Sequence, residues 1–241
     1  MLDVFSAGQT LAQRVLARRG TNTTTIGAAA PGATRVLFEN RSGRGRRILN
    51  LWPLLAQCNT LPGFVCGART FGTGQLADDV LAVRDVDVFV GMHGAGLSHA
   101  FFMRHGAALV EVRPFGFEGA WPDRYFRDAL QRAGDPVLHV LVSMGAPELC
   151  TPRWSLDTLP LNARDGACAL PWETLERALG HVRWLRQRPA RYAAATPAAR
   201  TLLAYPTAST PGVGPNAGAF VRAGLMRATR ESSRRRGELR Y

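Results

Sequence analysis

The chain has 241 residues, 46% of them hydrophobic and 20% charged, which is enough to form one sizeable packed core. No apolar run approaches the roughly 18 residues of a membrane-spanning helix, and the first residues lack the basic start and apolar stretch of a signal peptide. The net charge of +12 lies mostly beyond residue 181, so the folded body is almost neutral and no nucleic-acid partner is expected.

Hydrophobic spacing predicts an alternation of strands and helices along the chain. An amphipathic helix is predicted over residues 3–19, and with the polar stretch after it this makes an N-terminal helix and linker over 1–33. The elements expected next, in chain order, are a strand at 35–40, a helix at 48–57 that Pro53 must delay or kink, a strand at 64–66, a helix at 75–83, a strand at 87–92, a helix at 97–103, a strand at 107–112, a helix at 123–133, a strand at 137–142 and a helix at 172–186.

This alternation predicts the α/β class, with a Rossmann-like parallel sheet and helices on both faces over residues 34–188. Residues 189–241 form an Ala/Pro/Arg-rich tail without periodicity, predicted to be disordered. The four cysteines, Cys58, Cys66, Cys150 and Cys168, are too few and too scattered to indicate a disulfide scaffold, and they leave the redox compartment open.

Two predicted turns follow strands and suit an anion. The first, from Arg41 to Arg47, is rich in arginine, whose guanidinium groups match phosphate oxygens in two-point contacts. The second, His93-Gly94-Ala95-Gly96, combines glycines that allow close backbone approach with the free N–H groups that open a helix. Taken alone, the first could equally be a solvated basic loop and the second a tight turn, so their expected proximity at one sheet edge matters.

The residues in and around both turns resemble the signature of glycosyltransferase family 61. One marker runs from Phe89 to Met103, FVGMHGAGLSHAFFM, and is followed by GAALVEV at 106–112; the other is RSGRGRRILN at 41–50. Within the family the motifs are most similar to those of EGF domain-specific O-linked N-acetylglucosamine transferases, with plant xylosyl- and arabinosyltransferases as near competitors. The acidic residues usual in the family after the second marker are replaced here by Leu51-Trp52-Pro53-Leu54.

The resemblance implies an inverting transferase of the two-lobed GT-B type, of which this chain corresponds to the C-terminal, donor-binding lobe. It would transfer a sugar such as N-acetylglucosamine or xylose from a UDP-sugar donor to a hydroxyl of a protein or glycan. No metal site and no cofactor are expected, although a divalent cation stays open. Family members work in the Golgi or endoplasmic reticulum lumen, and the resemblance allows membrane anchoring of the full-length protein through an N-terminus missing from this chain.

The residues expected to bind the donor come from both turns and the strand after them. The catalytic base is unknown, and His93 is only a weak catalytic candidate that could equally be structural. Glu111 could accept ribose or sugar hydroxyls or be an ordinary strand-end carboxylate. His139 and His181 are interpreted as structural, with no partner evident. The full donor-binding set is Arg41, Ser42, Arg46, Arg47, His93, Gly94, Ala95, Gly96, Leu97 and Glu111.

Three other functions are weighed against this one, and one of them is nucleic-acid binding through the basic tail. The chain could be a truncated lobe that binds a nucleotide sugar without transferring it, since the acceptor half is expected to be missing. An α/β-hydrolase is a weaker alternative, because Gly96-Leu97-Ser98-His99-Ala100 is an imperfect nucleophile elbow that lacks its last glycine.

Overall fold

The computed structural model describes residues 4–19, 32–41, 45–117, 122–131, 137–151, 165–194 and 200–207. Its centre is a six-stranded sheet in the order β2-β1-β3-β4-β5-β8, and every neighbouring pair is parallel. The strands are β1 (Thr34–Glu39), β2 (Phe64–Arg69), β3 (Val88–Met92), β4 (Ala108–Arg113), β5 (Leu138–Met144) and β8 (Thr201–Ala204). The predicted α/β class and parallel sheet are confirmed.

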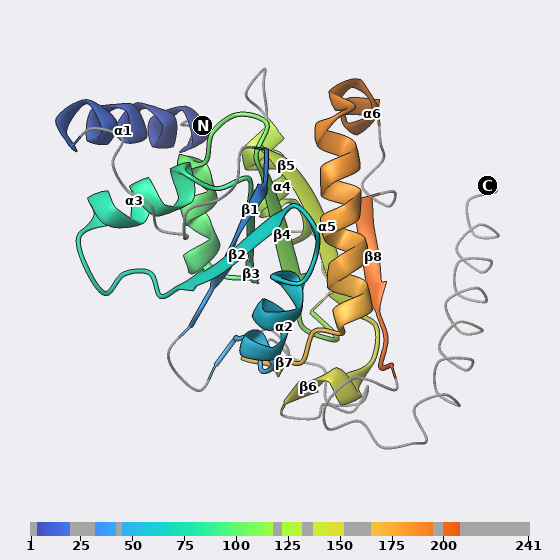
Figure 1. Cartoon of the computed structure of the whole chain (residues 1–241). Coiled ribbons are helices and arrows are strands. Elements are labelled where there is room, and N and C mark those ends of the chain that lie inside the picture. Colours follow the sequence, from blue (N-terminus) through green and yellow to red (C-terminus); the bar gives the residue numbers. More distant parts are fainter. Residues whose placement is uncertain are drawn as a thin grey trace, which may run out of the picture.

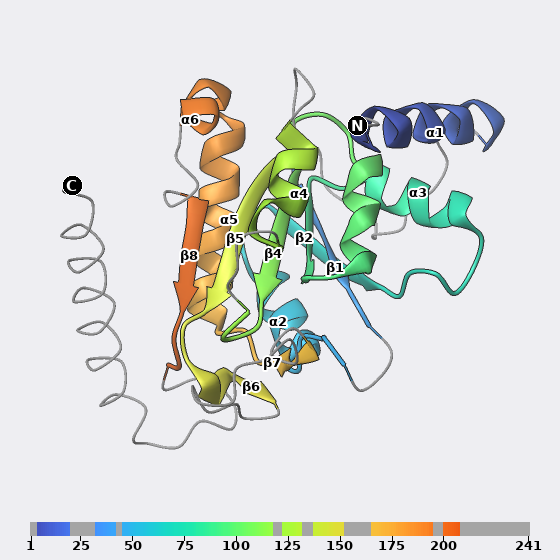
Figure 2. The same ribbon diagram turned by 180° about the vertical axis from the view of Figure 1, so that it is seen from behind.

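Helices cover both faces of this sheet (Figures 1 and 2). One face carries α2 (Leu51–Cys58) and α5 (Trp172–Arg186), and the opposite face carries α1 (Val4–Arg19), α3 (Leu76–Arg84), η1 (Ala95–Phe102) and α4 (Pro122–Gln131). Smaller elements are η2 (Pro147–Leu149), α6 (Pro189–Ala194) and the two-stranded antiparallel pair of β6 (Cys150–Thr151) and β7 (Ala167–Cys168).

The two cores follow from the alternation of side chains along buried strands. Val36 and Phe38 of β1 point into the core shared with α2 and α5, whereas Leu37 points into the core shared with α1, α3, η1 and α4. All three side chains are fully buried, as are most of those on β3, β4 and β5. Sheets covered on both faces read as continuous apolar runs, and the strands were recognised from that signal.

Two predicted helices differ in detail. The segment expected as an apolar helix at 97–103 is the 3₁₀ helix η1, which begins two residues earlier at Ala95. The helix expected at 48–57 begins late, at Leu51, so that Pro53 lies in its first turn, where a missing N–H costs no internal hydrogen bond.

The region beyond residue 188 is not uniformly disordered, so that prediction is wrong for 189–194 and 200–207. Strand β8 adds a sixth strand beside β5, and helix α6 places the buried Tyr192 so that its hydroxyl accepts the N–H of His139 at 2.7 Å. The sheet therefore continues past the boundary drawn from composition. The rest of the predicted tail lies outside the described residues.

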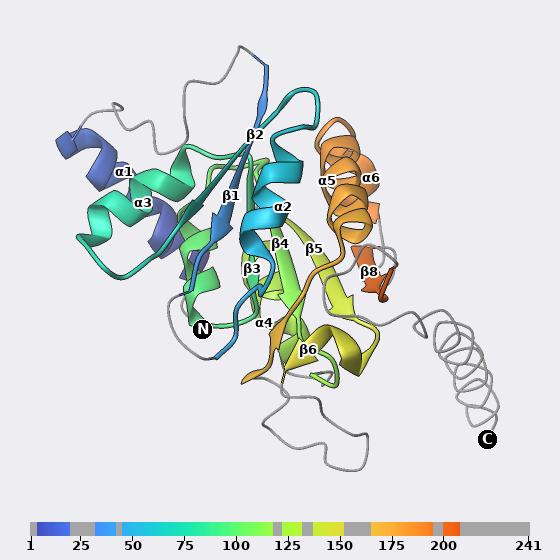
Figure 3. The same cartoon turned by 60° about the horizontal axis from the view of Figure 1, so that its bottom comes forward.

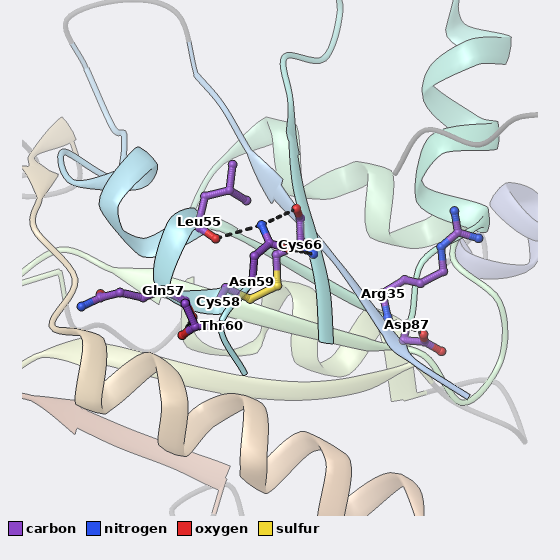
Figure 4. The surroundings of a disulfide bond; sticks show 8 residues. All are labelled: Arg35, Leu55, Gln57, Cys58, Asn59, Thr60, Cys66 and Asp87. Carbon is purple, nitrogen blue, oxygen red and sulfur yellow. Dashed lines mark hydrogen bonds between the residues drawn. A yellow bond between two sulfur atoms is a disulfide. The ribbon is translucent and has the colours of Figure 1, made fainter. Parts of the chain in front are cut away.

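All four cysteines are paired, as Cys58–Cys66 and Cys150–Cys168. The first pair links the end of α2 to β2, and Asn59 reinforces the connection through hydrogen bonds to the backbone of Cys66 and Leu55 (Figure 4). The sequence did not predict either pairing. Among the described residues, no helix combines the length and apolar character that a membrane span requires.

Candidate functional site

The two anion-suited turns meet at the point where the sheet topology reverses. Strand β1 lies between β2 and β3, and the chain leaves it toward α2 on one face but leaves β3 toward η1 on the other. In open α/β sheets, ligands bind at the carboxyl ends of the strands at this switch point. Figure 3 brings forward this end of the molecule, where α2 and β6 also lie, and Figure 1 labels β7 at the same end.

Gly94 brings the turn after β3 into contact with the arginine-rich turn. Its φ of +147° and ψ of −177° are accessible only to glycine. A β-carbon there would lie 2.8 Å from Arg46 Nη1 and 2.9 Å from Arg41 Nη1. The predicted proximity of the two turns is therefore confirmed, and the guanidinium groups occupy the space that the glycine leaves.

The guanidinium groups of Arg41 and Arg46 are partly buried, and each lies near a carboxylate that offsets part of its positive charge. Arg41 Nε lies 3.3 Å from Glu39 Oε1, and Arg46 Nε lies 3.3 Å from Asp165 Oδ1. Arg41 Nη1 also donates to the Arg46 carbonyl at 3.4 Å. Arg46 Nη1 also donates to the His93 carbonyl at 3.5 Å, so the arginine-rich turn is joined directly to the glycine turn. Ser42 and Arg44 of the same turn lie outside the described residues.

The exit of the arginine-rich turn is held by β7. The N–H of Cys168 donates to the Arg47 carbonyl at 3.0 Å, and the N–H of Leu49 donates to the Cys168 carbonyl at 2.8 Å. The Asn50 side chain donates to the Leu170 carbonyl at 2.8 Å and accepts from its N–H at 2.9 Å. This backbone pairing fixes the position of the Arg47 main chain, and so the point from which its side chain extends.

The backbone amides that open η1 are not equivalent. The N–H of Leu97, a residue of the expected donor-binding set, donates to the Gly94 carbonyl at 2.9 Å, so this amide is already used within the protein. Ala95 and Gly96 precede it in the first turn, where a 3₁₀ helix supplies no internal acceptor for its N–H groups. Ala95 is exposed and Gly96 partly exposed, whereas Gly94 and Leu97 are buried, so the accessible part of the turn is 95–96.

Glu111 lies at the centre of a fully buried network. Its Oε1 is 2.5 Å from His93 Nδ1 and accepts from Arg113 Nε at 2.9 Å, while its Oε2 is 2.6 Å from His139 Nε2. Burial alone would raise its pKa, but the hydrogen bonds from His139 and His93 and the charge of Arg113 hold it well below its usual range. With 0% exposure, Glu111 does not fit a direct contact with ribose or sugar hydroxyls, one of the two roles that the sequence left open; its contact with His93 Nδ1 orients that ring instead.

His139 therefore has a partner, contrary to the interpretation drawn from the sequence. The parallel register places Glu111 beside Leu141 on β5, two residues from His139, so that the two side chains share one face of the sheet. His93 is 6% exposed, and its ring packs against Phe117 and Phe126 with ring centroids 4.9 Å and 5.7 Å apart.

Glu39 was missed by the sequence analysis. It is the last residue of β1 and only 5% exposed, and burial raises its pKa to about 7 although Arg41 and Arg46 lower it. Its carboxyl group occupies the space beside Gly91 and Gly96 that side chains there would fill. The sequence did contain a signal for Glu39, because it is a charged residue at the end of a buried strand. It follows Leu37 by two residues, so both side chains lie on the face of the sheet that η1 covers.

A small pocket opens at the carboxyl end of β1. It has a volume of about 150 Å³, below the roughly 300–1,000 Å³ of sites that enclose a drug-sized ligand, so it would hold only part of a nucleotide sugar. The Trp52 side chain at its rim is 61% exposed. We call it the arginine pocket; its lining residues are Glu39, Asn40, Arg41, Arg47, Ile48, Leu49, Leu51 and Trp52.

The acidic pair Asp85 and Asp87 lies at the opposite, amino edge of the sheet. Asp87 accepts hydrogen bonds from the Arg35 N–H and from Arg186 Nη2, each at 2.7 Å, and it also pairs with Arg104. These contacts tie strands β1 and β3 to α5. Among the described residues, no cluster of three or more metal-ligating side chains is found.

The hydrolase alternative does not fit the position of Ser98. A nucleophile elbow places its serine in the turn directly after a strand. Ser98 instead lies in the fourth position of η1, and the turn after β3 is occupied by His93 and Gly94.

Comparisons with known proteins agree with the resemblance given by the motifs. Residues 6–110 match the model of the family Glycosyltransferase 61. The chain is 33% identical over 94 residues to the EGF domain-specific O-linked N-acetylglucosamine transferase of Bos taurus, covering 38% of this chain and 18% of that protein. The Mus musculus protein of the same name is 34% identical over 83 residues, 34% of this chain and 16% of its own length.

A plant protein shows a similar likeness. The alpha-1,3-arabinosyltransferase XAT2 of Oryza sativa subsp. japonica is 30% identical over 93 residues, which cover 39% of this chain and 16% of that protein. Each match thus spans less than a fifth of the relative. The region that matches the family model, 6–110, contains both turns of the site, and the predicted resemblance to glycosyltransferase family 61 is confirmed there.

Proposed function

We propose that this chain is the donor-binding part of an inverting glycosyltransferase that transfers a sugar, such as N-acetylglucosamine or xylose, from a UDP-sugar to a protein or glycan hydroxyl. The observation that carries the proposal is the contact of the Arg41 and Arg46 guanidinium groups with Gly94 at the sheet's switch point. The likeness to family 61 transferases in the same region supports the reaction class.

The arrangement suits the charge that develops when a sugar leaves its nucleotide. Breaking the bond between the anomeric carbon and the diphosphate leaves negative charge on the leaving oxygen, which fixed cations and amides stabilise. Arg41, Arg46 and Arg47 would supply the cations, and the N–H groups of Ala95 and Gly96 would supply amides. Because arginines provide this charge, we propose that donor binding needs no divalent cation.

His93 would act beside the diphosphate, held in place by Glu111. The Nδ1 contact with Glu111 fixes the ring orientation, so that the opposite nitrogen, Nε2, is the one directed away from the carboxylate. We assign His93 a positioning role toward the phosphate or sugar. The base that deprotonates the acceptor is unassigned.

The two disulfides and the likeness to glycosyltransferases together bear on the cellular compartment of the protein. Both disulfides need an oxidising environment to persist. This supports the proposal that the protein works in the lumen of the secretory pathway, in the Golgi or endoplasmic reticulum.

Calorimetric titration with UDP-N-acetylglucosamine and UDP-xylose tests the proposal. We expect binding that EDTA does not weaken and that falls about 10- to 100-fold in R41A and in R46A, because each variant loses charged hydrogen bonds. R188A is the matched control, since Arg188 stacks on Trp184 away from the site. Absence of binding, or equal loss in R188A, would contradict the proposal.

The alternative is a lobe that binds the donor without transferring the sugar. The shortness of the matches supports this alternative. They cover 18% of one relative and 16% of the other, so most of each relative's length lies outside the aligned region. UDP release in the presence of EGF-like domains or glycan acceptors distinguishes the two. Binding without acceptor-dependent UDP release supports the alternative.

A further inference from the structure

Glu39 is one of the residues that line the arginine pocket, and its carboxyl group lies beside Gly91 and Gly96. Its side chain is 4% exposed, and a β-carbon on Gly91 would lie 2.8 Å from its Oε2. Its carboxyl group also fills the space beside Gly96. Glu39 therefore contacts both turns that we propose for the donor diphosphate, the first through Arg41 and the second beside Gly96.

The hydrogen bonding of this carboxyl group is incomplete. Oε1 has an ion pair with Arg41 Nε at 3.3 Å, but Oε2 is buried without a hydrogen-bond partner in the part of the chain that the structure describes. An unpaired buried polar oxygen costs free energy. The site would be completed by a ligand that bonds this oxygen.

The charged and titratable groups around Glu39 come from every element packed against it. Cations dominate on the pocket side, while Glu111 lies in the same row of the sheet, on the far side of Gly91. Asp79 is already paired with Arg69, the register partner of Glu39 on β2. The set is Arg41, Arg46 and Arg47 from the turn, Arg69 from β2, Asp79 from α3, His93 after β3, His99 from η1 and Glu111 from β4.

An ionised carboxylate at this place would repel a diphosphate, whereas a neutral carboxylic acid can donate a hydrogen bond to it. We propose that Glu39 binds the donor diphosphate as a neutral acid, its O–H donating to a phosphate oxygen, so that donor binding takes up a proton from solution. This inference rests on the proposed function. The proton that an ionised Glu39 gains comes from water or buffer and is returned when the nucleotide leaves.

The electrostatics of the free protein allow this step near neutral pH. Because burial raises the pKa of Glu39 to about 7, both protonation states are populated there. A bound diphosphate adds negative charge and an acceptor for the O–H, and both raise the pKa further. Affinity should therefore be highest below pH 7 and fall as the pH rises above it.

The test is calorimetric titration of the full chain with UDP-N-acetylglucosamine and UDP-xylose at pH 6, 7 and 8. The phosphates of these diesters do not titrate in this range, so a pH effect belongs to the protein. We expect wild-type affinity to fall about 10-fold from pH 6 to pH 8, with uptake of about half a proton at pH 7, measured in two buffers of different ionisation enthalpy.

The E39Q variant isolates the group, because its amide donates a hydrogen bond at every pH. It should show a flat profile and bind about 10-fold more tightly than wild type at pH 8. E176Q, the same substitution on the exposed face of α5, should keep the wild-type profile.

Three outcomes overturn the inference. A flat wild-type profile without proton uptake does so while leaving the proposed function intact, as does an E39Q profile that falls like wild type. Absence of binding at every pH instead overturns the proposed function itself. If E39Q folds poorly, proton uptake is measured in E39A instead, and uptake equal to that of the wild type would overturn the inference.

Discussion

The carboxyl group of Glu39 occupies the place that a side chain on Gly96 would need, although the two residues lie 57 positions apart in the sequence. Glu39 closes β1, and Gly96 is the second residue of η1. The contact joins the two strand ends that form the switch point. The glycine therefore serves packing in the protein itself, besides any role toward a ligand.

Replacing Gly96 with alanine should destabilise the protein, because the new methyl group collides with the Glu39 carboxyl group. Overpacking of this kind typically costs about 1–3 kcal/mol, and donor affinity should fall with it. Urea unfolding measures the loss. G180A is the matched control, since nothing lies within 4 Å of a β-carbon on Gly180 in α5, and it should be neutral or stabilising.

A double-mutant cycle identifies the cause. If the collision with Glu39 is responsible, E39A/G96A should recover most of the stability that G96A loses, and the coupling should be about 0.5–3 kcal/mol. Additive effects of the two substitutions would contradict this explanation.

The stability of the protein should depend on Glu39 at neutral and alkaline pH. Burial raises the pKa of Glu39 from 4.5 to about 7, so the unfolded chain loses this proton at a lower pH than the folded chain does. Its contribution to stability is thus complete below pH 4.5 and is lost as the pH rises through 7. E39Q should match wild type near pH 4.5 and exceed it by about 3 kcal/mol at pH 8.

Urea unfolding at pH 4.5, 6 and 8 provides the measurement, with E176Q as the exposed control. A constant difference between E39Q and wild type across this range would exclude a titration of Glu39 as the cause.

The position of the site could be predicted because it depends on local signals. Buried strands such as Val88–Met92 read as apolar runs, and parallel topology then brings their carboxyl ends together. The prediction that Arg41 and Gly94 lie close together needed only that β1 and β3 be neighbours.

The missed features depend on contacts between distant residues. Strand β8 is four residues long and follows an Ala/Pro-rich stretch, so that only its pairing with β5 makes it a strand. The bond between Glu111 and His139 requires the register of β4 and β5, which no local pattern specifies. The disulfides likewise join residues brought together by the fold.

The Glu111 network should be the most sensitive part of the site to substitution. E111Q removes the negative charge that compensates the buried Arg113, which is 2% exposed, and it also removes an acceptor for His93 and His139. Removing one charged partner of a buried ion pair typically costs about 3–5 kcal/mol. Chemical unfolding at pH 7 should show this loss, and E176Q should show almost none.

The pH dependence gives an independent check on Glu111. Its pKa is lowered in the folded protein, so its stabilising contribution is present above its usual pKa of about 4.5 and is lost as the pH falls below it. The gap in stability between wild type and E111Q should therefore narrow below pH 4.5. A gap that stays constant down to pH 3 would show that geometry rather than charge is responsible.

The disulfide Cys150–Cys168 should support donor binding as well as stability. Cys168 is the residue whose backbone pairs with Arg47 and Leu49, so it fixes the exit of the arginine-rich turn. Removing a disulfide that joins cysteines 18 residues apart costs about 3 kcal/mol of stability. In the molecules that remain folded, the arginine-rich turn should be less well ordered. C150S/C168S should therefore bind UDP-sugars more weakly than wild type at 15 °C.

The second disulfide supplies the control for this effect. Cys58–Cys66 joins α2 to β2 across an 8-residue separation, and neither cysteine pairs with the backbone of the described part of the arginine-rich turn, residues 41 and 45–47. C58S/C66S should therefore lose a comparable amount of stability, about 2–3 kcal/mol, while keeping its affinity for the donor. Equal weakening of binding in both variants would mean that general loosening of the fold, rather than the anchoring of Arg47 by Cys168, sets the affinity.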